Sequence, residues 1–163
     1  MSEELRFVVA RLRASDIEPL TELVVAAQAD SDQRPRPAEA IRAAIAFDVE
    51  HHGLLVAAYD DDVLAAALFG SEPARMYSEF ALDARTFFFT ELSVHPRYRR
   101  RGLSRALMQM LGRELLAHSY RYALGHIPAG TRHEQMMQQW ATLRDGANGK
   151  PEYLFELERI VSD

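Results

Sequence analysis

The hydrophobic and polar residues of the chain follow two spacings, one typical of strands and one typical of helices. The strand spacing predicts strands at about 6–13, 54–59, 63–69, 87–94, 120–127 and 152–161. The helical spacing predicts helices at about 17–29, 38–52, 102–118 and 132–144. This order predicts an α/β fold (α+β in some schemes), with a mixed sheet of about six strands and four helices on its two faces.

Local turn and cap signals sharpen the ends of several of these elements. Ser15-Asp16-Ile17-Glu18 is a capping-box pattern at the start of the first helix. Gly53 stands where the second helix is expected to end. Asp60-Asp61-Asp62 separates two strand patterns and predicts a tight hairpin turn. Solvated carboxylates at this turn are a simpler interpretation than a cation site, because the spacing fixes no further ligand.

The composition excludes several classes of protein. A chain of 163 residues with 48% hydrophobic and 26% charged residues is expected to form one soluble globular domain. It has no cysteine, which excludes disulfides and thiol nucleophiles, and no histidine or carboxylate set has the spacing of a metal site. Neither a signal peptide nor an apolar run of roughly 18 residues is present, so we expect a cytoplasmic protein without membrane contact. The net charge of −5 argues against nucleic-acid binding.

The segment 87–108 carries the strongest chemical signal. A buried strand leads through an arginine-rich turn with one glycine, Gly102, into an amphipathic helix. Such a turn aims backbone N–H groups and the positive helix end at one point, which makes an anion site. Gly102 has no side chain, so the backbone can approach an anion closely. With the carboxylate of Glu91 in the strand, the segment predicts transfer chemistry on a phosphate-bearing cofactor.

The turn resembles a known cofactor motif. Arg99-x-x-Gly102-x-Ser104, after a strand that ends Leu92-x-Val94-x-Pro96, resembles the acetyl-CoA motif of the Gcn5-related N-acetyltransferases (GNAT). The family's turn reads Gln or Arg, two residues, Gly, one residue, then Gly or Ala, so Ser104 departs from it by one small residue. The resemblance is specific over about 87–116. It implies a single acyl-CoA N-acyltransferase domain over 1–163, with a twisted and mostly antiparallel sheet.

The same resemblance implies that acetyl-CoA is the cosubstrate. The backbone cradle for its pyrophosphate would be Arg100, Arg101, Gly102, Leu103 and Ser104. Further charge would come from the side chains of Arg99, Arg100, Arg101 and Arg105. The Leu92 N–H would hold the thioester carbonyl, and Val94 would pair with the pantetheine arm, where this strand splays from its neighbour.

Glu91 is the candidate general base. By resemblance to the family, the acetyl group would pass directly to a primary amine of a small molecule, peptide or protein, and a carboxylate would take the amine's proton. An equally simple interpretation is that Glu91 pairs with a neighbouring arginine. Many family members use a tyrosine on the last helix as general acid, but the segment 132–144 has none. Trp140 is expected in the core or against the cofactor. Tyr120, Tyr122, His126 and His133 are spare candidates for the acid, and a structural role is the simpler interpretation of each.

Several interpretations stay open from the residues alone. The fold could serve as a catalytically silent acyl-CoA sensor, because no general acid is evident. The acceptor pocket is expected to form from 30–37, the second helix, 71–85 and 128–133. The family often has two strands after the last helix, and only one is evident here. The sheet edge would then be short or completed by a partner chain, and a homodimer is compatible with the resemblance.

Overall fold

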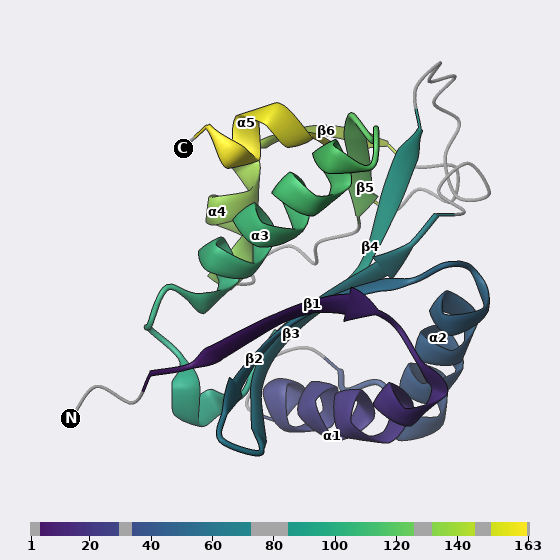
Figure 1. Ribbon diagram of the computed structural model, residues 1–163, viewed down its shortest axis with the longest axis vertical. Helices are drawn as coiled ribbons and strands as arrows, with labels where there is room; N and C mark the ends of the chain where they lie inside the picture. The colour runs from purple at the N-terminus through teal and green to yellow at the C-terminus, as the bar shows by residue number, and fades with distance from the viewer. Residues whose placement is uncertain (1–3, 30–33, 73–84, 126–131, 146–150, 163) are drawn as a thin grey trace.

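The computed structural model describes residues 4–29, 34–72, 85–125, 132–145 and 151–162, and these form one twisted sheet with helices on both faces (Figure 1). The strands are β1 (Arg6–Arg11), β2 (Leu54–Asp60), β3 (Val63–Ser71), β4 (Thr86–Val94), β5 (Tyr122–Gly125), β6 (Ala141–Asp145) and β7 (Pro151–Glu156). Their order is β1-β2-β3-β4-β5-β7-β6. Among the pairings of these described strands, β4 with β5 is parallel and the others are antiparallel.

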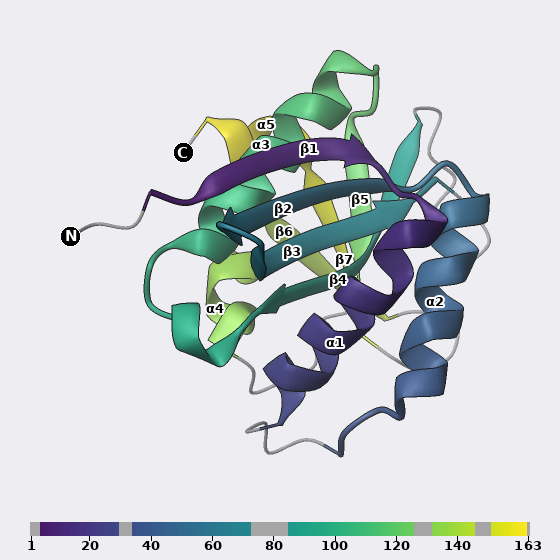
Figure 2. The same cartoon turned by 60° about the horizontal axis from the view of Figure 1, so that its bottom comes forward.

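The helices divide the core into two halves. They are α1 (Ile17–Gln28), α2 (Ala38–Glu50), α3 (Leu103–Ala117), α4 (Arg132–Gln138) and α5 (Leu157–Val161). Figure 2 shows α1 and α2 on one face of the sheet, with α3 and α5 on the other. Leu20, Ile45 and Phe69 are buried on the α1/α2 face. Leu107, Phe87 and Trp140 are buried in the larger cluster on the α3 face. The predicted α/β architecture is confirmed. The two cores include residues of β3 and β4, the strands on which the candidate site lies.

The C-terminal third corrects the predicted strand count from six to seven. The expected helix 132–144 ends at Gln138, and the residues that follow form strand β6. β6 pairs with β7, which pairs with β5, so β6 completes the sheet edge that we expected to be short or covered by a partner. The expected strand 152–161 ends at Glu156 and turns into α5, which buries Leu157 and Ile160. These burials explain why the apolar pattern continues past the strand.

Two helix caps also differ from the sequence prediction. Ser15 lies in a short 3-10 turn, and the carboxylate of Asp16 accepts a hydrogen bond of 2.8 Å from the Arg13 N–H. At the end of α2, where Gly53 was the expected C-cap, it is His52 that takes the left-handed conformation (φ 58°). Gly53 is needed for close contact instead, because a Cβ there would lie 2.6 Å from the Asp48 carbonyl oxygen and from Leu12 Cδ1.

Candidate active site

A β-bulge in β4 lies at the centre of the candidate site. Phe69 of β3 pairs with Glu91 and Gly70 pairs with Phe89, so Thr90 is an extra residue on β4. The two backbones come unusually close beside the bulge, since a Cβ on Gly70 would lie 1.9 Å from the Phe88 carbonyl oxygen. A glycine inside a strand often marks such a close approach. Bulges redirect side chains and are common near active sites.

The bulge decides which face of the sheet Glu91 occupies. Phe87 and Phe89 point into the core on the α3 face. Regular alternation would send Glu91 to the same face, because side chains in a strand alternate with a period of two. The extra residue shifts this alternation, so Leu92 and Val94 join the α3-face core. Glu91 pairs with Phe69, which belongs to the core on the α1/α2 face, and its carboxylate reaches residues on that side.

Beyond the bulge, the backbone of β4 is open on its β5 side in the described part of the chain. The parallel pairing with β5 runs from Thr86↔Tyr122 to Phe89↔Gly125 and goes no further. The His95 N–H donates to the Ala65 carbonyl at 2.8 Å, which makes this opposite pair a hydrogen-bonded one. In an antiparallel ladder such pairs alternate with pairs whose polar groups point away. The N–H and C=O groups of Leu92 and Val94 therefore point toward the opening, where the resemblance places the pantetheine arm.

The turn after β4 presents its backbone at the start of α3. Arg100 (φ 64°) and Gly102 (φ 71°) both adopt left-handed conformations. A Cβ on Gly102 would meet no atom within 4 Å, so this backbone faces open space. The helical hydrogen bonds begin with Ala106 N–H to the Gly102 carbonyl at 3.1 Å. The N–H groups of Leu103 and Ser104 precede that bond, and N–H groups at a helix start have no intrahelical partner, which suits an anion.

Two anchors hold this turn against the rest of the molecule. The buried Tyr98 donates its hydroxyl to Asp60 Oδ2 at 2.6 Å, which ties the turn to the β2–β3 hairpin. The Arg99 guanidinium donates to the Ala27 carbonyl at 2.7 Å, at the end of α1. The Arg99 side chain is thus directed toward α1. Asp60, at the hairpin, has Tyr98 as a structural partner.

Arg101 and Arg105 lie against aromatic rings. Arg101 lies with its Cζ 5.2 Å from the centre of the Tyr98 ring, and Arg105 lies 5.1 Å from that of Trp140. Arg100 and Arg101 are exposed. The structure therefore places several positive charges around the start of α3, as the resemblance implies. Trp140 is buried, which agrees with the expected core position.

Glu91 forms an ion pair with Arg36, which lies just before α2. Arg36 Nη2 is 2.8 Å from Glu91 Oε2, and the exposed fractions of the two side chains are 52% and 18%. The hydroxyl of Ser93 donates to Glu91 Oε1 at 3.3 Å. Burial raises the pKa of Glu91. The charge of Arg36 and the hydrogen bonds from Arg36 and Ser93 act in the opposite direction and offset part of this increase in pKa. A carboxyl with a raised pKa beside an open backbone is suited to accept a proton.

Replacing Arg36 with glutamine is expected to raise the pKa of Glu91 further, because the charge that favours the carboxylate is lost. If Glu91 is the base, the rate rises as pH increases through this pKa. The acid side of the pH–rate profile should therefore move to higher pH in Arg36→Gln. The measurement is kcat/KM against pH for both proteins, and an unchanged profile would show that Arg36 does not tune the base.

Asp48 is a second buried carboxyl on the same side of the bulge. Its Oδ1 accepts a hydrogen bond of 2.6 Å from the Ser71 hydroxyl. Its Oδ2 is buried and has no hydrogen-bond partner among the described residues. Burial raises the pKa of Asp48 above its ordinary value, and the hydroxyls of Ser71 and Thr90 and the charge of His51 oppose part of this rise. The ionised form of Asp48 is therefore costly in the folded protein.

We expect Asp48→Asn to raise the free energy of unfolding at neutral pH, because the amide cannot ionise and so avoids the cost of a buried charge. A raised folded-state pKa means that the folded protein holds this proton more tightly. The stability from the protonated form is complete below the ordinary pKa of 3.8 and is lost as pH rises through the folded pKa. Urea unfolding at several pH values should show the variant's advantage at pH 7 shrinking in acid. A destabilised variant at pH 7 would contradict this.

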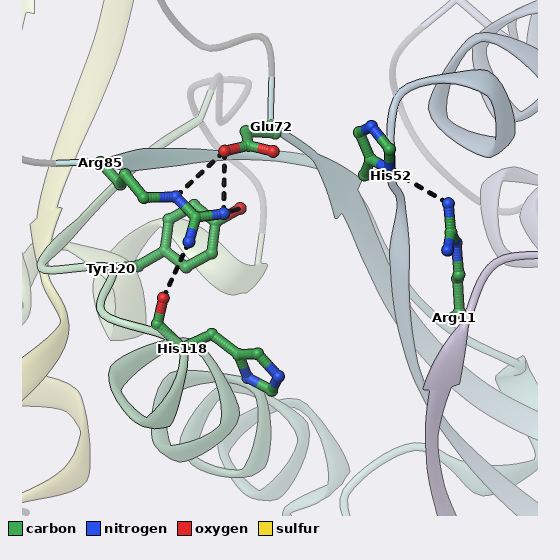
Figure 3. A network of polar contacts seen from close by, with 6 residues as sticks. All are labelled: Arg11, His52, Glu72, Arg85, His118 and Tyr120. Carbon is green, nitrogen blue, oxygen red and sulfur yellow. Dashed lines mark hydrogen bonds and ion pairs between the residues drawn. The ribbon is translucent and has the colours of Figure 1, made fainter.

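Tyr120, which lies just before β5, has a structural role. Figure 3 shows Arg85 contacting Glu72, Tyr120 and His118. Arg85 Nη2 lies 2.8 Å from Glu72 Oε1 and 2.7 Å from the Tyr120 hydroxyl. Tyr120 therefore lies near the end of α3 opposite the turn, away from Gly102. Of the other spare candidates, Tyr122 lies beside Arg121, whereas His126 and the His133 side chain lie outside what the structure describes.

Arg36 lies in the segment 30–37 that was expected to line the acceptor pocket, and its ion pair matches the alternative interpretation of Glu91, but neither Arg36 nor Gly70 was singled out from the sequence. Gly70 carried a usable signal, since a glycine at the end of an apolar strand pattern suggests a bulge. Arg36 carried none, because its contact with Glu91 depends on how α2 packs on the sheet. In the described ranges, no group of three His, Asp or Glu side chains could hold a metal ion. Nor does any described helix have the length and apolarity to cross a membrane.

Several solved structures of other proteins share this fold. An acetyltransferase of the GNAT family from Desulfovibrio desulfuricans has 14% identity and a TM-score of 0.67, over 93% of this chain and 99% of that one. The PaiA N-acetyltransferase of Thermoplasma acidophilum, solved with coenzyme A, has 11% identity and a TM-score of 0.66 over the same shares of 93% and 99%. The ribosomal-protein-S18-alanine N-acetyltransferase of Escherichia coli has 18% identity and a TM-score of 0.63, over 91% of both chains.

A comparison with curated protein sequences gives no match. The profile described as "Acetyltransferase (GNAT) family" matches residues 17–137, which include the β4 bulge and the turn at Gly102. The resemblance carried by Arg99, Gly102 and Ser104 is thereby confirmed, and the chain belongs to the GNAT acetyltransferase family.

Proposed function

We propose that this protein is an N-acetyltransferase that moves an acetyl group from acetyl-CoA to a primary amine. The observation that carries the proposal is a pair of features on β4: the backbone groups of Leu92 and Val94 that point toward the opening on the β5 side, and the adjacent Glu91, whose side chain lies on the α1/α2 face. Membership of the GNAT family and the coenzyme A complex of the Thermoplasma neighbour support acetyl-CoA as the cosubstrate. The absence of cysteine agrees with a cytoplasmic enzyme.

The proposed reaction needs no covalent enzyme intermediate. The amine nitrogen attacks the thioester carbonyl carbon, the new C–N bond forms, and the C–S bond breaks. Glu91 takes the proton lost by the amine, directly or through water. The Leu92 N–H stabilises the oxyanion of the tetrahedral intermediate. The coenzyme A thiolate leaves and takes a proton from water, since no residue on this chain is assigned as general acid.

The experiment that tests this function separates binding from transfer. Calorimetric titration with coenzyme A measures the affinity of the turn, and an amine panel with acetyl-CoA measures release of free thiol and formation of the amide. Tight coenzyme A binding with amide formation supports the enzyme. Binding without amide formation from any amine supports the alternative, a catalytically silent acyl-CoA sensor. Absence of coenzyme A binding contradicts both.

Gly102→Ala is expected to weaken coenzyme A binding about tenfold or more while the protein still folds. A side chain in the left-handed conformation costs roughly 1–2 kcal/mol, and the added methyl group would face the open space where the pyrophosphate is expected. Calorimetry with coenzyme A measures the loss. Arg113→Gln, an exposed substitution on the same helix, is the matched control and should bind like the unmodified protein. Equal affinities in the two variants would show that the turn does not hold the cofactor.

A further inference from the structure

Arg36 lies beside Glu91, and its guanidinium has further donors that contact no other described residue. A guanidinium has five N–H donors. In the part of the chain that the structure describes, its partner is Glu91, at 2.8 Å from Nη2. About half of the Arg36 side chain is exposed, whereas Glu91 is mostly covered. Arg36 thus stands on the solvent side of the candidate base with donors available to a ligand.

The backbone of Arg36 is fixed independently of this ion pair. Gln28, the last residue of α1, donates from its Nε2 to the Arg36 carbonyl at 2.7 Å. Its Oε1 also accepts from the Arg36 N–H at 3.3 Å. One carboxamide therefore binds both polar groups of the same peptide residue. This double contact positions Arg36 before any ligand arrives, which reduces the ordering cost of binding.

A positive and a negative charge placed side by side favour one type of acceptor. An amine that reaches Glu91 passes next to Arg36. A simple ammonium ion is attracted to Glu91 but repelled by Arg36. An amine with a nearby carboxylate places its ammonium against Glu91 and its carboxylate against the guanidinium, which binds carboxylates with paired hydrogen bonds.

We infer that the acceptor is an amino-carboxylate compound, an amine with a carboxylate on the same small molecule, and that Arg36 binds this carboxylate. The inference rests on the proposed acetyltransferase function. It makes Arg36 a specificity-determining residue in addition to its effect on the pKa of Glu91. The two roles differ in outcome: a change in the base affects all amines alike, whereas loss of the carboxylate contact affects only acceptors that carry one.

The test compares α-, β- and γ-amino acids with their carboxamides, using acetyl-CoA and measuring kcat/KM for each pair. The unmodified protein should prefer at least one carboxylate over its carboxamide. Arg36→Gln should reduce that ratio about tenfold to a hundredfold, the range of one charge-assisted hydrogen bond. Arg36→Lys keeps the charge but not the paired donors, so it should retain part of the preference. Arg113→Gln changes an exposed arginine on α3, on the other face of the sheet, and should leave the ratio unchanged.

A ratio that is the same in Arg36→Gln and in the unmodified protein would overturn the inference, even if all rates fall together. A preference for the carboxamides would also overturn it, while leaving the acetyltransferase function intact. If no amine is acetylated, the proposed function fails. The carboxylate site is then tested separately, by calorimetric titration of the coenzyme A-loaded protein with the same amino acids. Binding that is lost in Arg36→Gln supports the carboxylate site, and absence of binding refutes it.

Discussion

Glu91→Gln is expected to lower kcat by about 10²–10⁴-fold, the usual contribution of a positioned general base. Glutamine keeps the size of the side chain and can still accept a hydrogen bond from Arg36, but it cannot take a proton. The affinity for coenzyme A should stay the same, because the turn at Gly102 lies outside this substitution. Steady-state rates with acetyl-CoA and calorimetry with coenzyme A measure the two quantities in parallel.

Glu18→Gln is the matched control for this loss. It makes the same chemical change in another ion pair, where Glu18 Oε1 lies 2.8 Å from Arg42 Nε and both side chains are exposed. Its kcat should equal that of the unmodified protein. If Glu91→Gln keeps its rate within a few-fold, Glu91 is the structural partner of Arg36 and not the base.

Gly70→Ala is expected to destabilise the protein by about 1–3 kcal/mol or more, because the new Cβ overlaps backbone. That atom would lie 1.9 Å from the Phe88 carbonyl oxygen and 2.8 Å from Phe87 Cε1. Separating β3 from β4 at this point would disturb the bulge that directs Glu91. The midpoint of thermal unfolding should fall by about 2–4 °C for each kcal/mol lost, and kcat should fall with it.

Gly125→Ala separates this effect from the general cost of replacing a strand glycine. A Cβ on Gly125 would lie 3.5 Å from Phe89 Cβ and 3.7 Å from Phe155 Cε2, which are ordinary contacts. Gly125 also lies on β5 beside β4, so its surroundings are similar. We expect this variant to unfold near the temperature of the unmodified protein. Equal stability of the two variants would show that the tight contact at Gly70 is relieved at little cost.

Features that depend on neighbouring residues in the chain were predictable from the sequence. The apolar spacing on α3 and the glycine of the turn at Gly102 are local, and both lie where the pattern placed them. The hairpin at Asp60–Asp62 is also local, and it joins β2 to β3 as expected. The contact of Tyr98 with Asp60 was not predictable, because it depends on two segments that meet only in the folded protein.

Features set by pairing between strands were harder to predict. The bulge at Thr90 is a property of the register between β3 and β4, and β4 alone reads as a regular strand. Strand β6 was read as helix because Ala141, Leu143 and Arg144 are good helix formers. Its pairing with β7 overrides that preference. The sequence offered an arginine partner for Glu91 as one interpretation, but it could not identify Arg36, because this ion pair depends on how α2 packs on the sheet.

The last turn of α1 contacts both halves of the candidate site through consecutive residues. The Ala27 carbonyl accepts from Arg99 of the cofactor turn. The Gln28 carboxamide holds Arg36 beside Glu91. A cofactor that displaces Arg99 would therefore act on the acceptor side through a single helical turn. Thermodynamic linkage makes such an effect reciprocal: any gain in acceptor affinity caused by bound cofactor equals the gain in cofactor affinity caused by bound acceptor. The affinities for the two substrates would thus be coupled through one short piece of helix.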